Sequence, residues 1–193
     1  MLYEDHNLVF IHQRKCAGST AYKFLGPLSR EDKGKYQNGV TDKYWDEAAL
    51  ADRLKVAIVR NPWDRFVSGW KYCESTKENS LLETLKNPPM EGHDYRHLTR
   101  SQVAALKYPD GRWAVDMLIS FEDLQTGFDI LCDHLKIEKK QLPVINALKD
   151  RPTYQAAFGP EEQEVFASLM ADDIESLGYS FDKPGVPGIT MYP

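Results

Sequence analysis

Two short, uninterrupted apolar runs constrain the fold of this chain more than any other feature. Residues 8–11 read Leu-Val-Phe-Ile and residues 56–59 read Val-Ala-Ile-Val, and each run passes directly into a polar loop. Such runs are typical of strands buried on both faces of a parallel sheet. Because helical patterns follow both runs, we expect βαβ units and an α/β fold in which helices cover both faces of a doubly wound parallel sheet, giving three layers.

Helix signals alternate with these runs. Asn61 suits an N-cap and Pro62 the first helical position, and apolar side chains then recur at positions 63, 66, 67 and 70. Further helices are expected from Ser19 or Thr20 to Leu25, over residues 81–86, 99–107 and 128–135, and from Pro160 to just before Gly178. A third strand is expected over residues 115–121, and the proline-rich residues 184–193 predict an irregular tail.

Length and composition bound the function. The chain of 193 residues fits one domain, which we place over residues 1–183, and its net charge of -5 argues against a nucleic-acid binder. No signal peptide is readable, and the apolar runs are too short to insert into a membrane. Three cysteines without a CxxC pair indicate reduced thiols in the cytoplasm, and the three cysteines and five histidines show no zinc-type spacing, so we expect no metal.

The first polar loop has the composition of an anion site. Lys15, Gly18, Ser19 and Thr20 lie between the first apolar run and a helix. Backbone N–H groups and the positive end of that helix would point at one spot, and a glycine lets a ligand come close. An ordinary turn with a solvated lysine is an equally good interpretation of this loop alone. Unlike a Walker A loop, the lysine precedes the glycine by three positions, which weakens a kinase interpretation.

The second polar loop pairs a cation with a hydroxyl. Arg60 follows the second run directly, and Ser68 comes two helical turns later, apart from the apolar stripe of that helix. A guanidinium fork and a hydroxyl can together hold a terminal phosphate. The alternative is that Arg60 pairs with an acid and Ser68 lies on the surface. Arg65 is expected to make a structural ion pair, for instance with Asp64.

Taken together, the two loops resemble those of the sulfotransferases that use 3′-phosphoadenosine 5′-phosphosulfate (PAPS), in particular the carbohydrate-sulfotransferase branch and its small bacterial relatives. Residues 10–20 are similar to the 5′-phosphosulfate loop of that family, and residues 59–68 are similar to its 3′-phosphate loop. Weaker similarities follow in the family's order at residues 97–102, 121–124 and 173–179. Arginine and cysteine at positions 14 and 16 depart from the residues that many relatives carry around the loop lysine.

The resemblance implies a P-loop nucleotide-hydrolase-like sulfotransferase fold and sulfuryl transfer from PAPS to an acceptor hydroxyl without a metal. It implies that the 5′-phosphosulfate is surrounded by Lys15, Ala17, Gly18, Ser19 and Thr20. The 3′-phosphate would then be held by Arg60 and Ser68. Lys15 would stabilise the charge that develops on the leaving phosphate oxygen. Residues 151–154 lie where such enzymes often place a loop over the nucleotide.

The general base is ambiguous. Some relatives carry a histidine after a glycine ahead of the second strand, but this chain has Gly39 and Val40 there. Asp42 is a nearby carboxylate, and a solvated acid is its plainer interpretation. His97 is the other candidate, in a loop expected to face the site, with an imidazole suited to neutral pH.

Two other functions stay open. A P-loop kinase for a small molecule would need a Mg²⁺ ligand at the end of the second strand, where Arg60 stands instead. A non-catalytic nucleotide-binding protein of the same fold would keep the anion loops and lack a base. The acceptor, a small molecule or carbohydrate, and the oligomeric state are not readable from the sequence.

Overall fold

The computed structural model describes all residues except 144, 146–150, 184–188 and 192–193. Contacts divide the chain into two compact units. The first contains Met1–Val59, the described residues of Ala104–Asn146 and a strand near the C-terminus, and the second contains Arg60–Val103 and the described residues of Ala147–Val186. Compactness is not the same as independent folding, so a single domain over residues 1–183 stays a prediction.

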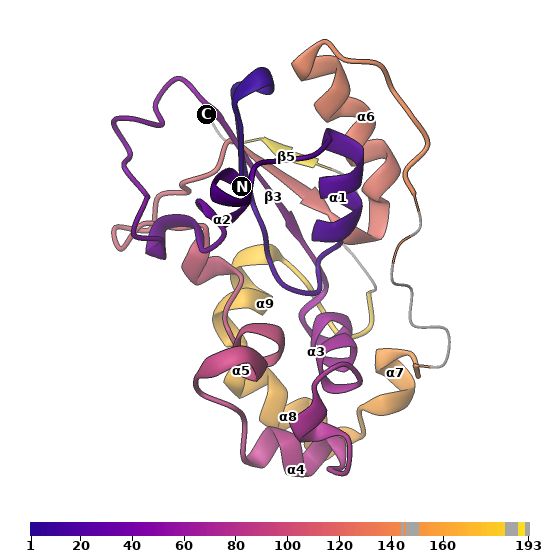
Figure 1. Ribbon diagram of the computed structural model, residues 1–193. Helices are drawn as coiled ribbons and strands as arrows, with labels where there is room; N and C mark the ends of the chain where they lie inside the picture. The colour runs from indigo at the N-terminus through magenta and orange to yellow at the C-terminus, as the bar shows by residue number, and fades with distance from the viewer. Residues whose placement is uncertain (144, 146–150, 184–188, 192–193) are drawn as a thin grey trace. The chain divides into compact units, whose positions relative to one another are not determined.

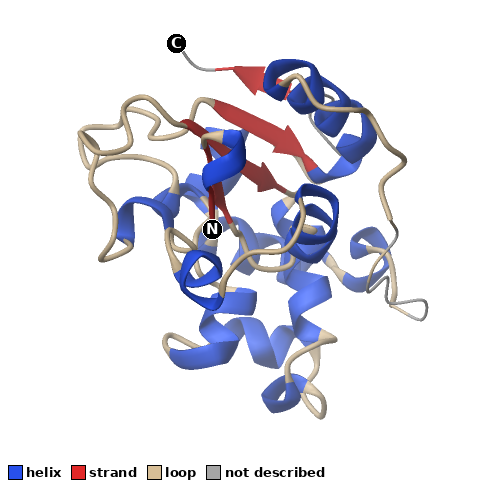
Figure 2. Ribbon diagram, turned by 45° about the horizontal axis from the view of Figure 1, so that its top comes forward, coloured by secondary structure: helices blue, strands red, loops and turns tan. Residues whose placement is uncertain are grey.

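The first unit is built on a five-stranded sheet with the order β1-β2-β3-β4-β5. Its strands are drawn in red in Figure 2. The strands are β1 (Leu2–Tyr3), β2 (Leu8–Ile11), β3 (Leu54–Val59), β4 (Met117–Ser120) and β5 (Ile189–Met191). β2, β3 and β4 pair in parallel, whereas β1 and β5 run antiparallel at the two edges. The three central strands confirm the prediction of parallel strands drawn from the apolar runs.

The central strands are buried on both faces. Phe10 pairs with Val56, and Val56 pairs with Met117, so these side chains share one face and one core cluster. Residues of the opposite parity on β2 and β3 are buried as well. Helices α1 (Gly18–Leu25) and α6 (Leu124–Leu135) cover the clustered face, where Phe24 meets Phe128 edge to face at 5.0 Å (Figure 1).

Shorter elements complete the first unit. They are α2 (Arg30–Gly34) and the 3-10 turns η1 (Glu4–His6), η2 (Gly39–Thr41) and η5 (Phe121–Asp123). The 3-10 turn η4 (Val103–Ala105) begins in the second unit at Val103 and continues in the first. The only regular structure in residues 99–107 is η4, so the helix expected there is wrong.

The sheet is mixed rather than wholly parallel, because both edge strands escaped the sequence interpretation. β1 and β5 have two and three residues, too few for an alternating pattern to register. β5 also corrects the expectation of an irregular tail, although residues 184–188 and 192–193 of that tail lie outside the described part of the chain. The three-layer, P-loop-like arrangement stays a prediction.

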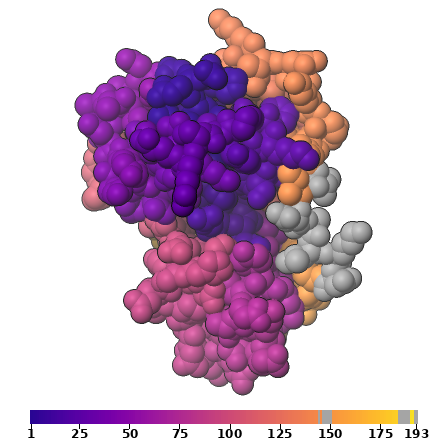
Figure 3. Space-filling view, in the orientation of Figure 1, coloured from indigo at the N-terminus to yellow at the C-terminus, as the bar shows by residue number. Residues whose placement is uncertain are grey.

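The second unit is helical. Its helices are α3 (Pro62–Trp70), α4 (Leu81–Lys86), α5 (Gly92–Leu98), α7 (Tyr154–Ala157), α8 (Pro160–Leu169) and α9 (Ala171–Leu177), with the 3-10 turn η3 (Glu74–Thr76). An aromatic core joins them, in which Trp63 and Phe158 both pack against Phe166. In the space-filling view, the magenta to pink surface of residues 60–103 is continuous (Figure 3). Across the described residues, no helix has the length and apolar character needed to cross a bilayer.

Helix α3 confirms its predicted cap and stripe, since the Asn61 side chain accepts from the N–H of Asp64 and the apolar residues face the core. It also packs tightly against α5. A Cβ on Gly69 would lie 2.4 Å from the carbonyl oxygen of His97, so only glycine fits there. The last predicted helix begins and ends as expected but breaks at Met170 into α8 and α9.

Candidate functional site

The loop before α1, in the first unit, has the backbone of an anion cradle. Lys15 and Ala17 adopt left-handed conformations, with φ of 66° and 55°, on either side of Cys16, whose φ is not positive. Alternation between right- and left-handed residues turns successive N–H groups toward one side, the geometry called a nest. Ala17 is the N-cap of α1 and supplies no side-chain hydrogen bond, so the first-turn N–H groups are not capped by it.

Neither hydroxyl of this loop caps the helix, although the sequence predicts a helix start at Ser19 or Thr20. Ser19 and Thr20 lie inside the first turn of α1, because the helix already begins at Gly18. Ser19 is exposed, whereas Thr20 is buried and its hydroxyl donates to the carbonyl oxygen of Pro143 at 3.4 Å. Of the two, Ser19 is therefore the more accessible donor.

Gly18 also has a packing role, beside His12. A Cβ at this position would come within 1.9 Å of Nε2 of His12, so the imidazole of His12 lies directly against the glycine. The ring thus braces the loop from the end of β2.

The residues that depart from the family pattern are tied to the first unit itself. Arg14 donates to the Gln37 side chain at 3.2 Å, and the buried thiol of Cys16 contacts the carbonyl oxygen of Arg14 at 3.5 Å. Cys16 therefore fills space beside the loop.

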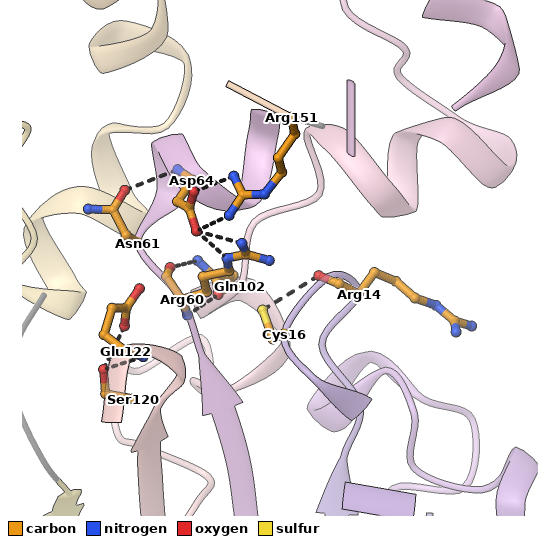
Figure 4. Close-up of polar contacts among 9 residues, drawn as sticks. All are labelled: Arg14, Cys16, Arg60, Asn61, Asp64, Gln102, Ser120, Glu122 and Arg151. Carbon is orange, nitrogen blue, oxygen red and sulfur yellow. Dashed lines mark hydrogen bonds and ion pairs between the residues drawn. The ribbon is translucent and has the colours of Figure 1, made fainter. Parts of the chain in front are cut away.

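The second loop centres on a carboxylate shared by two arginines (Figure 4). Nε and Nη2 of Arg60 donate to one oxygen of Asp64 at 2.8 and 2.5 Å. Arg151 donates to both oxygens of the same carboxylate at 2.5 and 3.1 Å. Two guanidinium groups against one carboxylate leave the cluster with a net positive charge, which suits an anion.

The charge state of Asp64 follows from the same contacts. Burial alone would raise the pKa of this carboxyl, but the hydrogen bond from Arg151 and the positive charge of Arg60 outweigh burial and hold the pKa below its ordinary value. Asp64 is therefore a carboxylate at neutral pH and keeps both guanidinium groups oriented.

The backbone of Arg60 is fixed by a second, buried network. Its N–H donates to Oε1 of Gln102 and its carbonyl accepts from Nε2 of Gln102, both at 3.0 Å (Figure 4). Asp173, which is 1% exposed, accepts from the N–H groups of Gln102 and Val103 at 2.9 and 3.0 Å. It also accepts from the hydroxyl of Ser101 at 2.6 Å. A charge on α9 thus anchors the turn that clamps the Arg60 peptide.

For α3, the alternative that Ser68 lies on the surface and the expectation of an Arg65 ion pair are both wrong. Ser68 is buried, at 6% exposure, although it stands off the apolar stripe, because α3 is enclosed along nearly its whole length. Arg65 makes no salt bridge in the described parts of the chain. Its Nη2 donates instead to the carbonyl oxygens of Leu98 and Arg100, at 3.3 and 2.6 Å, where it caps the C-terminal end of α5.

His97 lies in the last turn of α5 rather than in a loop, and it is 8% exposed. Its Nδ1 lies 2.8 Å from the carbonyl oxygen of His93. A carbonyl can only accept, so Nδ1 carries the proton and Nε2 carries the basic lone pair of the neutral ring. This tautomer is the one that a general base acting through Nε2 requires.

Asp42 follows η2 in the first unit and is already engaged by the chain. One carboxylate oxygen accepts from the N–H of Asn38 at 3.3 Å and the other from the N–H of Tyr44 at 3.2 Å. These bonds give Asp42 a turn-stabilising role, and they make it a less apt base than His97.

The weaker sequence similarity at residues 121–124 has a local explanation. The hydroxyl of Ser120, at the end of β4, accepts from the N–H of Glu122 and donates to its carboxylate at 2.6 Å (Figure 4). This pair closes the turn η5.

Of the predicted residues, the 15–20 loop and Asp42 belong to the first unit, whereas Arg60, Ser68 and His97 belong to the second. Within the second unit, the sequence interpretation missed the joint role of Asp64, Gln102 and Asp173. The one available signal was the i, i+4 spacing of Arg60 and Asp64 on a helix start. The partners of Gln102 are more than 40 residues away in sequence and left no local pattern.

Among known proteins, one family model matches this chain. No curated protein and no solved structure shows significant similarity to the chain. The model of the Sulfotransferase family matches residues 1–168, which include both anion loops and His97. With most of its length matched, and with an α/β fold that carries a lysine loop and an arginine loop after successive parallel strands, the chain belongs to the sulfotransferase family.

Proposed function

We propose that this sulfotransferase takes its sulfuryl group from PAPS and transfers it to a hydroxyl of a small molecule or carbohydrate. The observation that carries the proposal is the cluster of Arg60, Asp64 and Arg151, a net cation whose geometry is fixed by four hydrogen bonds. A donor with a phosphate besides its phosphosulfate needs such a cation in addition to the lysine loop. Arg60 would bind the 3′-phosphate, with Ser68 as a further donor.

The loop around Lys15 suits the other end of the donor. The nest at Lys15 and Ala17 and the first turn of α1 offer N–H groups to a phosphosulfate, and Gly18 and Ser19 begin that turn. In this proposal Ser19 donates a hydrogen bond, and Thr20 joins it only after turning from Pro143.

Transfer would proceed by in-line displacement. The acceptor oxygen forms a bond to sulfur while the bond from sulfur to the bridging phosphate oxygen breaks, and the acceptor proton moves to a base. Catalysis then depends on positioning and on stabilisation of charge, as in phosphoryl transfer. Lys15 would neutralise the leaving phosphate oxygen, and His97 would take the proton at Nε2, with Asp42 as the alternative base. No metal is needed for these steps.

A kinase of similar topology is the main rival. It requires an acid for Mg²⁺ where β3 ends, and the chain places Arg60 there, directly after Val59. The family match also favours sulfuryl over phosphoryl transfer. A non-catalytic nucleotide-binding protein would share the loops but not the chemistry.

Transfer of labelled sulfate from PAPS to a panel of sugars, phenols and aliphatic alcohols tests the proposal. The expected result is at least one labelled product that requires PAPS and survives removal of divalent cations. Transfer of labelled phosphate from ATP in the same panel, with Mg²⁺ and without sulfate transfer, would establish the kinase instead. Binding of PAPS without labelled product for any acceptor class would favour the non-catalytic alternative.

A further inference from the structure

A thiol, an imidazole and a carboxylate converge in the second unit, on residues other than those assigned to the donor. Among the described residues, one ligand atom each of Cys73, His93 and Asp94 lies within 4.8 Å of the other two. Cys73 stands between α3 and η3, and the other two residues lie in the first turn of α5. All three belong to the second unit.

The three side chains are held in place by their neighbours. Nδ1 of His93 lies 2.7 Å from a carboxylate oxygen of Asp94, and the hydroxyl of Ser75 donates to the other oxygen. The imidazole of His97 stacks on that of His93 with ring centroids 4.1 Å apart. Partners of this kind orient metal ligands before the ion arrives and tune their basicity.

The backbone of Cys73 is fixed as well. Its N–H donates to the carbonyl oxygen of Gly69 at 2.8 Å, at the end of α3, and its own carbonyl accepts from the hydroxyl of Thr76 at 3.0 Å. The side chain of Cys73 is buried and takes part in no disulfide. The thiol is thus protected from bulk solvent and held close to the carboxylate.

The ligand set selects the class of ion. Magnesium and calcium prefer oxygen ligands only, whereas a thiolate with an imidazole favours zinc and similar transition metals. Zinc sites that are open to a further ligand use three protein side chains and leave a fourth position. An open hollow of about 520 Å³ next to the three side chains can accommodate a ligand at the fourth coordination position. Its lining includes His93 and Asp94, together with Ser75, Thr76 and Glu91.

We propose that Cys73, His93 and Asp94 bind one divalent transition metal, with zinc as the best match, whose fourth position faces this hollow and takes water or an oxygen or nitrogen ligand. The sequence interpretation expected no metal, because the cysteine is 20 residues from the histidine and no spaced motif joins them. On binding, the thiol loses its proton to solvent, and Nδ1 of His93 gives up its proton while Nε2 takes one from solvent. The hydrogen bond between His93 and Asp94 is then replaced by two bonds to the ion.

Titration of the untagged protein with cobalt(II) tests this site directly. A tetrahedral site with one thiolate should give visible ligand-field bands and a near-ultraviolet thiolate-to-cobalt charge-transfer band that saturate at one equivalent and disappear on addition of zinc. Cys73→Ser should abolish the charge-transfer band. The matched control Cys132→Ser, which removes a buried thiol in the first unit, should leave both sets of bands unchanged.

A second readout protects the test against misfolding of the cysteine variant. Zinc should raise the unfolding temperature of the wild type, magnesium should not, and Asp94→Asn and His93→Gln should lose the zinc effect while His134→Gln retains it. A wild-type protein that shows no thiolate-to-cobalt band, or a Cys73→Ser variant that keeps it, overturns the proposal. A zinc-induced stabilisation that survives in both Asp94→Asn and His93→Gln overturns it as well.

Discussion

At the scale of single residues, Lys15 is the side chain on which the proposed chemistry depends most. It sits in a left-handed conformation inside the nest, directly before the N-cap region of α1. Lys15→Ala should lower kcat by at least about a hundredfold while the fold survives, because the loss of one charge-stabilising donor has effects of this size. The matched control is Lys23→Ala, which removes an exposed lysine from helix α1.

Sulfate-transfer rates, with circular dichroism to verify folding, measure this effect. Lys23→Ala should retain the wild-type rate. A folded Lys15→Ala variant with near-normal kcat would falsify the assignment of Lys15.

The choice of base is also decided by individual residues. If His97 takes the proton from the acceptor hydroxyl, only the enzyme with a neutral His97 imidazole is active. The value of kcat/KM should therefore fall as the pH drops below the pKa of that imidazole. His97→Ala should flatten this acid limb and reduce the rate by about a hundredfold or more. Asp42→Asn should keep the limb, because Asp42 is bound to backbone N–H groups.

The pH–rate profiles of the wild type and both variants settle the question. A lost acid limb in Asp42→Asn with a normal limb in His97→Ala would reverse the assignment. Unchanged profiles in both would eliminate both residues.

The role of a single residue was predictable from the sequence where its partners are a few positions away, and not where they are distant. The cap at Asn61 and the apolar stripe of α3 were predictable, since both depend on neighbours within a few positions. The carbonyl partners of Arg65 were not, because burial of α3 on nearly every side is a tertiary property. Arg151 lies 87 residues from Asp64 in the sequence, and its contact with this carboxylate has no sequence signature.

At the scale of elements, a buried polar link joins α9 to the turn after α5. Asp173 satisfies the N–H groups of Gln102 and Val103, and at 1% exposure it holds them out of contact with bulk water. Asp173→Asn keeps one acceptor oxygen but places an N–H donor where the other oxygen accepts, so one of the two backbone N–H groups loses its acceptor. It should lower the free energy of unfolding by about 2 kcal/mol, the cost of one unsatisfied buried N–H group.

Urea unfolding of Asp173→Asn beside Asp172→Asn measures that cost. Asp172 is the exposed neighbour of Asp173 on α9, and among the described residues its side chain bonds to Ser176. The free energy of unfolding of Asp172→Asn should stay within about 0.5 kcal/mol of that of the wild type. Equal effects in the two variants would contradict the anchoring role of Asp173. A loss of affinity for the 3′-phosphate in Asp173→Asn is expected too, because Gln102 would no longer hold the Arg60 peptide.

Elements with strong local signals were predictable, and those made by long-range pairing were not. The helix over residues 81–86 has a capping box of Ser80 and Glu83 and appears as expected. The break at Met170 between α8 and α9 was not predictable, because no proline or glycine marks it in the sequence. The edge strands β1 and β5 exist only because β2 and β4 offer them partners.

For the whole molecule, stability should depend on pH through Asp64. The folded pKa of this carboxyl lies below its ordinary value, so its contribution is fully present above about pH 4 and is lost as the pH falls through the folded pKa. At pH 7, Asp64→Asn should lower the free energy of unfolding by about 2 kcal/mol, less than for a fully buried pair because Asp64 keeps some contact with water.

Urea unfolding at pH 7 and in steps below pH 4 checks this sign. The difference between wild type and Asp64→Asn should shrink toward low pH. Asp133→Asn, which breaks an exposed pair with Lys139, should have a small effect at every pH. A difference that grows as the pH falls would contradict the role of Asp64 as a stabilising carboxylate.

The central claim, that a guanidinium in this chain recognises the 3′-phosphate of the donor, is tested most directly by calorimetric titration with adenosine 3′,5′-bisphosphate and adenosine 5′-monophosphate. The account predicts that the wild type binds the bisphosphate more tightly than the monophosphate, without Mg²⁺. Arg60→Ala should lose at least about tenfold of that preference, the worth of a charged hydrogen bond, while the exposed control Arg112→Ala keeps it. Equal affinity of the wild type for the two nucleotides, or a preference that is unchanged in Arg60→Ala, would contradict the account.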